Sequence, residues 1–423
     1  MAGLADSDYF MDLSLVDDPY PYFEALSAEG PVKRLPAHNV VAVTGFEEAV
    51  AVYLDTDNYS AVNSVTGPLP PIPFVPEGAD ITGQIEANRS QMPFGEELLT
   101  LDPPRHTPLR SLLTRLFTPR RLREMETYIT GLADRLIDEF EARRQCELAR
   151  DYNMPFSMLV IADLLGVPVE DRDEFRSKLG PPSQVGAGGG VPIINPLEFR
   201  REKFLHYIEE RRRQPRDDIL SDLANAALPD GSTPEAMDVV HVASLLFGAG
   251  QDTTTHMLGN AMRIIAERPE LQASLRANPE RIPAFVEEVL RFAGPVKATF
   301  RLARKPVRIA GMNIAPGTTV MLATAALNRD PHRFDDPAAF RPGRPAANQH
   351  LSFGRGAHTC PGAALARTET RISLERLLAR LDAITIDPDR HGAPGERHFT
   401  YAPTYIFRAL RELHLRFVPA VSR

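Results

Sequence analysis

Residues 353–362 read Phe-Gly-Arg-Gly-Ala-His-Thr-Cys-Pro-Gly and place one cysteine, Cys360, between a glycine-rich loop and the expected start of a helix. Residues 363–381 contain Ala, Leu and Arg without an internal Pro or Gly, which predicts an amphipathic helix. Pro361 suits the first helical position, where its missing N–H has no intrahelical partner. A sulfur just before that start lies at the positive end of the helix, which favours the thiolate, the form that binds metal.

A buried free cysteine that packs as a small hydrophobic residue is the alternative for Cys360. Its neighbours favour a ligand, because Phe353 can shield one side, the glycines allow close approach to a flat molecule, and His358 can meet an anionic group. The pattern Phe-Gly-x-Gly-x-His-x-Cys-x-Gly resembles the cysteine-ligand loop of the cytochrome P-450 haem-thiolate monooxygenases at every fixed position. The resemblance implies that Cys360 is the axial ligand of a haem b iron, with Phe353, His358 and Gly362 beside the haem.

Composition limits the class of protein. The chain has 423 residues, is 43% hydrophobic and shows no linker, so we expect one haem domain over residues 1–423. Its two cysteines give no disulfide framework and suit a reducing cytoplasm, and Cys146, in a polar stretch without a partner motif, is predicted to have no role. The net charge of −8 argues against nucleic-acid binding. Residues 1–32 lack a long apolar run, so we expect no signal peptide, no membrane anchor and a cytoplasmic monomer.

Hydrophobic periodicity predicts a mainly α protein with a small β portion. A very long helix is expected over residues 234–267, and at 1.5 Å per residue it would span roughly 50 Å. In the family this is the central helix that crosses the haem. Shorter helices are expected at 46–54, 105–117, 120–142, 152–166, 197–213, 217–227, 270–277 and 281–293. Strands are expected in a hairpin over 31–43 and at 298–303, 306–310, 318–322, 384–386 and 413–418.

The centre of the long helix, residues 249–255, reads Ala-Gly-Gln-Asp-Thr-Thr-Thr. Glycine and β-branched residues are poor helix formers. The threonine hydroxyls can simply bond back to the preceding turn, or the local weakness can open a groove for a diatomic ligand. The stretch matches the family's Ala-Gly-x-(Asp/Glu)-Thr pattern. The resemblance implies that Thr253 stabilises the bound, partly reduced oxygen and that Asp252 feeds protons inward.

Two further pairs match motifs of the family. Glu288 and Arg291 project from one helix face and match its Glu-x-x-Arg, which implies a structural triad completed by Arg341 or, as we favour, Arg344. His106 and Arg110 also share a helix face. The resemblance implies that this pair holds haem propionates together with Arg301 and His358. The two propionates need such hydrogen-bonded partners once they are desolvated.

The resemblance predicts an enzyme that oxidises a small hydrophobic molecule with O2 and two electrons. No Gly-x-Gly-x-x-Gly opens a helix after a strand, so we expect no bound flavin or nicotinamide. Electrons are expected from a [2Fe-2S] or similar ferredoxin with its reductase, docking near Arg115, Arg120, Arg121 and Arg355. A haem-thiolate sensor and a peroxide-dependent enzyme are the alternatives, and the Asp252–Thr253 pair argues against both.

The substrate is less determined. By position in similar proteins, the pocket draws on residues 64–98, the glycine-rich loop 180–196, which we expect to act as a lid, and residues 401–404. Lys297 could pair with a substrate carboxylate, but we favour its exposure to solvent, because lysines seldom lie buried and unpaired. Steroid, terpenoid, fatty-acid and aromatic-acid substrates stay open. The single residues assigned to the pocket are Leu246, Ala249, Val296, Lys297, Ala298 and Tyr401.

Overall fold

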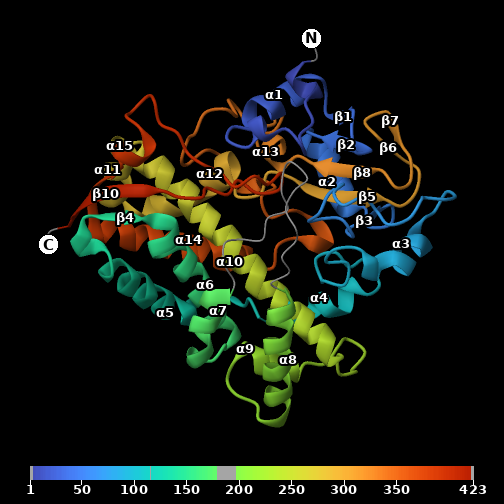
Figure 1. The fold of residues 1–423 in the computed structure, drawn as a ribbon, viewed down its shortest axis with the longest axis horizontal. Helices are drawn as coiled ribbons and strands as arrows, with labels where there is room; N and C mark the ends of the chain where they lie inside the picture. Colours follow the sequence, from blue (N-terminus) through green and yellow to red (C-terminus); the bar gives the residue numbers. More distant parts are fainter. Residues whose placement is uncertain (1–2, 115, 179–196, 421–423) are drawn as a thin grey trace.

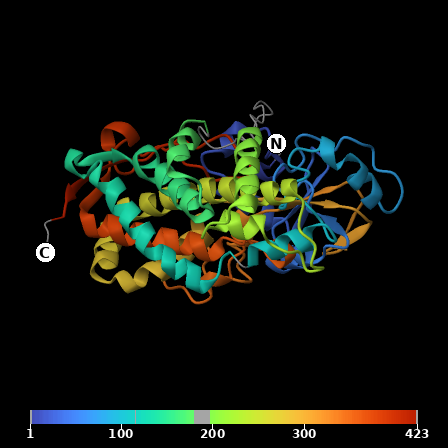
Figure 2. The same cartoon turned by 90° about the horizontal axis from the view of Figure 1, so that it is seen from below.

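A computed structural model describes residues 3–114, 116–178 and 197–420. Helices fill one part of the molecule, and the larger sheet lies with the N-terminal segment at the opposite end (Figures 1 and 2). The expectation of a mainly helical protein with a small β portion is therefore confirmed. Within these described ranges, no helix is both long enough and apolar enough to cross a membrane.

The long helix α10 (Ala236–Ala266) crosses the centre of the molecule (Figure 1). It begins two residues later than predicted and ends just before Arg268-Pro269. It packs against α6 (Met154–Leu165), α8 (Leu197–Arg213) and α14 (Ala363–Arg380). Buried side chains occur on several of its faces, as expected of a helix in the core of a large protein.

The other predicted helices are present, and the described residues contain three more helices of at least seven residues that the sequence did not predict. These three are α1 (Tyr20–Ala28), α3 (Thr82–Asn88) and α7 (Arg172–Lys178). The prolines before and within the first turn of α1 are compatible with a helix start, where no N–H is needed. The predicted helices are α2 (Phe46–Leu54), α4 (His106–Thr114), α5 (Pro119–Asp138), α9 (Ile219–Ala224), α11 (Pro269–Ala277) and α12 (Ile282–Ala293), and short turns form α13 (Thr324–Leu327) and α15 (Pro388–His391).

The larger sheet has five strands in the order β1-β2-β8-β5-β3. The β2–β8 pair is parallel, whereas the pairs β1–β2, β8–β5 and β5–β3 are antiparallel. Strand β5 carries Arg301, with its neighbours Phe300 and Leu302 buried. The strands are β1 (Val32–Arg34), β2 (Val40–Val43), β3 (Tyr59–Ser60), β5 (Thr299–Ala303) and β8 (Thr319–Leu322), and a separate hairpin joins β6 (Val307–Ile309) to β7 (Met312–Ile314).

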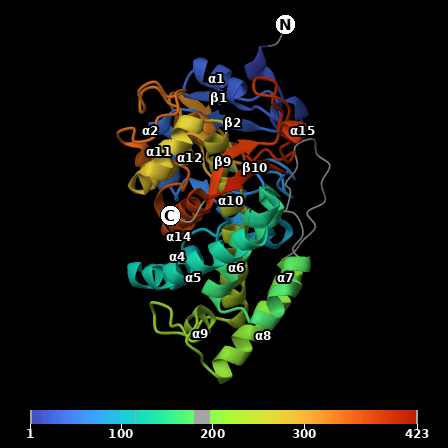
Figure 3. The same ribbon diagram turned by 90° about the vertical axis from the view of Figure 1, so that its left-hand side faces the viewer.

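A three-stranded sheet, in the order β4-β10-β9, covers the end of the helical part. It is formed by β4 (Gln145–Glu147), β10 (His414–Pro419) and β9 (Leu381–Ile386). Cys146 pairs with Leu415 across β4 and β10 and is buried in the main core. Cys146 is thus a core residue of a short strand, and the two cysteines are both free. Figure 3 shows α8 and α9 at the end of the molecule opposite α1.

Candidate functional site

The cysteine loop is closed by its own backbone. The Cys360 N–H donates to the Phe353 carbonyl at 2.9 Å, and a short 3-10 turn, Gly356–His358, lies between them. Gly356 has a φ of +69°, and a Cβ there would come within 2.7 Å of the Tyr53 carbonyl oxygen on α2, so glycine is required at this contact. Helix α14 begins at Ala363 with Gly362 as its N-cap, so the prediction that Pro361 is the first helical residue is wrong.

Opposing effects act on the Cys360 thiol. Burial raises its pKa, while a hydrogen bond from the Gly362 backbone and the charges of Arg110 and Arg367 act to lower it. The backbone donor expected near the helix start is therefore present, and two unpredicted arginines add to it, but burial outweighs all three in the protein alone. A metal cation at the sulfur would supply the missing positive charge, because a coordinated thiol is deprotonated outright.

Four basic side chains gather at one edge of the loop, and we call His106, Arg110, Arg301 and His358 the cationic edge. The His106 and His358 rings lie 4.2 Å apart. His106 Nδ1 and His358 Nε2 are buried without a hydrogen-bond partner in the described part of the chain. Burial and the nearby arginines lower the pKa of His106 to about 4 and that of His358 to about 2.

The two arginines of the cationic edge meet only neutral acceptors. Arg110 donates to the Thr359 carbonyl, and Arg301 donates to the Phe300 carbonyl at 2.7 Å. Arg301 also lies over the Tyr53 ring, 5.4 Å from its centre, and Tyr53 Oη is 2.9 Å from Thr299 Oγ1. Burial lowers the pKa of both guanidinium groups. Neither arginine forms a salt bridge within the residues that the structure describes, so the cationic edge is suited to an anion with several oxygen atoms.

The Glu-x-x-Arg pair is fully buried. Arg291 Nη2 lies 2.8 Å from Glu288 Oε1, and both side chains have 0% exposure. Arg344 Nε lies 3.3 Å from the same oxygen and is buried. Arg341 contributes its backbone N–H at 2.8 Å, while its exposed side chain pairs with Asp336. The triad is therefore completed by Arg344, the residue that the sequence analysis favoured.

One face of α10 is accessible where the rest of the helix is packed. Ala249 is exposed and Thr253, one turn later, is half-buried. Thr253 Oγ1 donates back to the Ala249 carbonyl at 2.8 Å, and the helix is continuous through the three threonines, as the first of the two interpretations predicts. A small cavity of about 20 Å³ lies between this face and the cysteine loop and is lined by both Thr253 and Phe353.

Ionisable groups with little access to solvent lie on or near the same part of α10. Burial raises the pKa of Asp252 to about 7, although the charge of Arg200 from α8 opposes the shift. His256 is buried with both ring nitrogens unpartnered in the described ranges. Glu369 of α14, which the sequence analysis did not identify, bonds Thr254, and burial raises the pKa of Glu369 to about 8. Its spacing from the buried Leu365 and Ile372 is the pattern that could have revealed it.

The residues assigned to the substrate pocket are dispersed. Leu246 is buried in the main core, and Ala298 packs in a separate cluster that contains Phe300. Val296 forms an isolated bridge with Phe407. Tyr401 lies in another place altogether: the Arg408 guanidinium covers its ring at 3.2 Å, and it lines a surface pocket together with Arg263. Of the six, only Ala249 lies on the accessible face next to Thr253.

Lys297 is buried, so the expectation that it points to solvent is wrong. Its Nζ donates to the Thr404 carbonyl at 2.6 Å and lies 5.9 Å from the centre of the Tyr9 ring. Burial, reinforced by the charge of Arg408, lowers the pKa of Lys297 to about 7. Backbone pairing with Ile406 places the side chain inside the fold, which a single sequence does not indicate.

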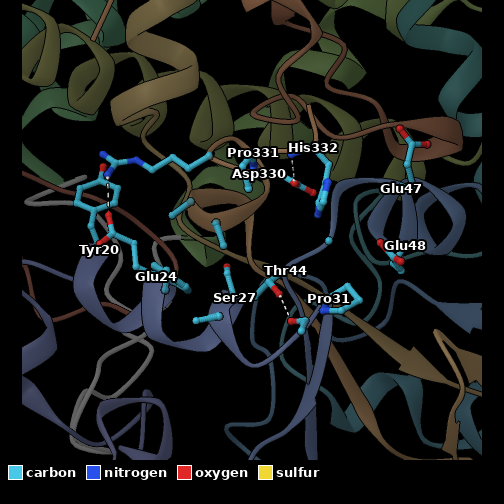
Figure 4. A pocket seen from close by; sticks show the side chains of 17 residues that line it. Tyr20, Glu24, Ser27, Pro31, Thr44, Glu47, Glu48, Asp330, Pro331 and His332 are labelled. Atoms are coloured by element: carbon cyan, nitrogen blue, oxygen red, sulfur yellow. Dashed lines mark hydrogen bonds and ion pairs between the residues drawn. The ribbon is translucent and has the colours of Figure 1, made fainter. Parts of the chain in front are cut away.

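A second surface pocket, of about 580 Å³, lies between α1, α2 and α13 (Figure 4). Acidic side chains such as Glu47, Glu48 and Asp330 line it, and Asp330 Oδ2 accepts the Phe46 N–H at 2.8 Å. None of the predicted site residues lines this pocket. The site is therefore the space between α10 and the cysteine loop.

Comparison with known proteins agrees with this geometry. The chain is 32% identical to the cytochrome P450 monooxygenase PikC of Streptomyces venezuelae over 95% of its own length and 91% of the relative's. The chain belongs to the cytochrome P450 family. The family model named Cytochrome P450 matches residues 194–397. The solved structure of Mycobacterium marinum cytochrome P450 CYP150A6 in its substrate-free form is 51% identical, with a TM-score of 0.93, and covers 99% of this chain and 100% of that one.

P450 proteins bind haem b, and the residues of this chain fit that group. The orphaned nitrogens of His106 and His358, with Arg110 and Arg301, are the donors that two carboxylates require. The P450 relatives are monooxygenases, and this chain is an oxidoreductase of the same kind. Relatives of similar identity carry different names, including the biotin biosynthesis cytochrome P450 of Bacillus subtilis at 30% over 95% of this chain.

Residues 180–196, the expected lid, and Arg115 lie outside the described residues. The other arginines expected to meet a redox partner differ in their surroundings. Arg120 and Arg355 are exposed, whereas Arg121 is half-buried and pairs with Asp222 of α9 at 2.8 Å.

Proposed function

We propose that this P450 oxidises a small hydrophobic organic molecule with O2 and two electrons from an external ferredoxin system. When bound, the haem supplies the centre at which dioxygen is activated, and a thiolate ligand favours cleavage of the O–O bond. One observation carries the proposal: Thr253 and Phe353 line the same small cavity, and Thr253 directly follows the half-buried acid Asp252. The Thr253 side chain thus lines a cavity that it shares with the cysteine loop, and the Asp252 carboxyl belongs to the adjacent residue of α10.

In this proposal Cys360 is the axial ligand. Phe353 and Gly362 shield the sulfur, and the cationic edge holds the propionates. The buried Glu288–Arg291–Arg344 triad keeps the segment before the cysteine in place, because a fully desolvated pair tolerates little displacement. Each of these residues has a structural partner or an orphaned donor that agrees with its assigned role.

Asp252 and Thr253 are assigned to proton delivery. With its pKa raised to about 7, the Asp252 carboxyl can hold a proton at neutral pH and release it, which suits a general acid. Thr253 Oγ1 now donates to the Ala249 carbonyl, and rotation of the hydroxyl would redirect that proton into the cavity. The Arg200 charge, which acts on Asp252 from α8, favours the return of the carboxylate.

Thr253→Ala is the direct test. The variant should keep its affinity for substrate while reducing equivalents are diverted to hydrogen peroxide. Thr255→Ala is the matched control, because Thr255 Oγ1 bonds Gln251 and Asn153 carbonyls and lies buried. Coupling is measured as product formed per NADH consumed, with dioxygen and a ferredoxin system compared with peroxide alone. Normal coupling in Thr253→Ala would show that the role of Thr253 is wrong.

A small hydrophobic substrate is proposed from the apolar Ala249, which lies on the accessible face next to Thr253. The apolar Leu246, Val296 and Ala298 lie apart from this face and do not carry the proposal. Steroids, terpenoids, fatty acids and aromatic acids are the candidates, and the change of the haem absorption on ligand binding screens them. Lys297 is the proposed contact for a substrate carboxylate, and acidic compounds should then bind better than their esters. Lys297 is buried and donates to the Thr404 carbonyl, so equal binding of acids and esters would exclude this contact.

The ferredoxin is proposed to dock on the face that carries the exposed Arg120 and Arg355, with Arg121 nearby. An acidic partner would be attracted to such a surface in a way that salt weakens. Neutralising these arginines should slow reduction by ferredoxin and leave the affinity for substrate unchanged. Unchanged reduction rates would exclude this docking face.

A further inference from the structure

Arg367 of α14 is held between a carboxylate and an aromatic ring. Its Nε and Nη2 donate to Glu287 Oε1 and Oε2 at 2.5 and 3.0 Å, a bidentate pair that fixes the guanidinium plane. The guanidinium carbon lies 4.6 Å from the centre of the Phe353 ring. Glu287 directly precedes the triad residue Glu288 on α12, but the triad does not use it. The pair thus has no role in the assignments made so far.

The Phe353 ring has further restraints. His350 is buried, with its ring centre 5.8 Å from that of Phe353 and its Nε2 3.3 Å from Glu287 Oε2. Ser352 Oγ donates to the Leu290 carbonyl of α12 at 2.6 Å. The Phe353 carbonyl in turn accepts the Cys360 N–H. Contacts from α12 and α14 therefore fix Phe353, whose carbonyl is hydrogen-bonded to the cysteine backbone.

The Arg367 charge reaches the cysteine itself. Arg367 stacks on the Phe353 ring, and the Phe353 carbonyl accepts the Cys360 N–H at 2.9 Å, so one residue separates the guanidinium from the cysteine. The Arg367 side chain is 35% exposed and that of Glu287 is 18% exposed, so water screens the two charges only in part. The net field at the sulfur from this pair depends on both residues, because Glu287 offsets part of the positive charge.

We propose that Arg367, held by Glu287 against Phe353, is a positioning residue that sets the reduction potential of the haem by keeping one positive charge at a fixed place beside Cys360. The inference rests on Cys360 being the iron ligand, as proposed above. Reduction adds one electron to the site. A nearby cation stabilises the reduced form and a nearby anion destabilises it, so the charges around the ligand change the reduction potential.

The test is a spectroelectrochemical titration of the haem-loaded protein, without substrate or redox partner. Arg367→Gln should shift the potential to more negative values and Glu287→Gln to more positive values. The double variant should return close to the wild type. Arg367→Lys keeps the charge, so it should stay nearer to the wild type than Arg367→Gln does. Two single variants that shift in the same direction, or not at all, would overturn the inference.

Arg371→Gln is the matched control. Arg371 lies one turn further along α14 and pairs with Glu126 and Glu375 at 2.9 and 3.1 Å, away from the Phe353 stack. The substitution Arg371→Gln removes one positive charge, as Arg367→Gln does, and should leave the reduction potential unchanged. A shift equal to that of Arg367→Gln would overturn the inference. If Arg367 variants fail to bind haem, the sign of the Glu287→Gln shift decides alone.

The absorption of the reduced carbonyl complex separates this inference from the function on which it rests. A wild-type complex without the red-shifted band of thiolate ligation would remove the proposed function and this inference together. A normal band with unmoved potentials in the variants would remove only this inference. Thermal unfolding of each variant checks that the compared proteins are folded.

Discussion

Charged groups on the two sides of the site are treated differently by the fold. On the cysteine side, Glu288 lies fully buried between Arg291 and Arg344, with hydrogen bonds at every interaction. On the side of α10, Asp252 is half-buried and forms no salt bridge in the described ranges, and His256 is buried with both ring nitrogens unpartnered there. A paired charge holds a geometry, whereas an unpaired one is free to change its protonation state or to meet a ligand. The difference indicates that one side is built for rigidity and the other for chemistry.

The paired side should show the largest loss of stability. Glu288→Gln leaves Arg291 and Arg344 as buried cations without a carboxylate, and the free energy of unfolding should fall by about 3–5 kcal/mol. Chemical denaturation measures it. Glu124→Gln is the control, because Glu124 forms an exposed pair with Arg120. That change should stay within about 0.5 kcal/mol, and equal losses in the two variants would contradict the contrast.

The side of α10 should show its effect in turnover. Asp252→Asn keeps the shape of the side chain and removes its exchangeable acid, so turnover should fall about 10²-fold. The free energy of unfolding of the variant should not be lower than that of the wild type, and above pH 7 it should be higher by a constant amount. The sign follows because a folded pKa raised to about 7 destabilises the ionised form, a penalty that grows from about pH 4 to 7 and is complete above that. A stability loss without a turnover loss would reverse the assignment.

Two arginines near β5 sharpen the comparison. Arg301 has no salt bridge in the described chain, whereas the buried Arg304 lies 3.2 Å from Asp102. Arg301→Gln should weaken haem binding about tenfold and leave the haem-free protein at least as stable. Arg304→Gln should do the opposite, lowering the free energy of unfolding with little change in haem loss. Haem transfer to a scavenging protein and denaturation of the haem-free forms measure the two effects.

Lys297 should give the smallest effect at high pH, and the pH dependence of that effect is diagnostic. Its folded pKa of about 7 lies below the unfolded value, so the unfolded chain binds more protons between about pH 7 and 10.5. Wild-type stability should therefore rise with pH across this window relative to Lys297→Met. Above it the two proteins should differ only by the lost hydrogen bond to Thr404, about 1 kcal/mol. A constant difference would show that Lys297 stays charged in the fold.

Local patterns in the sequence predicted the long helix, the cysteine loop and the Glu288–Arg291 pair, because each depends on residues that are close along the chain. The choice of Arg344 over Arg341 depended on a contact across 56 positions, and only the fold resolved it. The roles of Cys360, Thr253 and the cationic edge stay predictions, now with geometry that supports them. Their assignment came from the family resemblance rather than from periodicity.

What sequence reasoning missed has a common physical cause. Lys297, Tyr401 and Glu287 take their surroundings from segments far away in the chain: Thr404 and Tyr9, Arg408, and Arg367. A lysine in a short strand-like segment gives no local indication that it will be buried. Helical spacing could have predicted the burial of Glu369, but not its contact with Thr254 of another helix.

Tyr53 joins parts of the molecule that belong to different layers. Its carbonyl limits the space at Gly356, its ring lies under Arg301, and its hydroxyl meets Thr299 of β5. Any movement of Arg301 toward an anion must therefore be accommodated by α2 and by the larger sheet. The contacts of α2 and of the larger sheet are in this way coupled to the position of a side chain that is assigned to hold the prosthetic group.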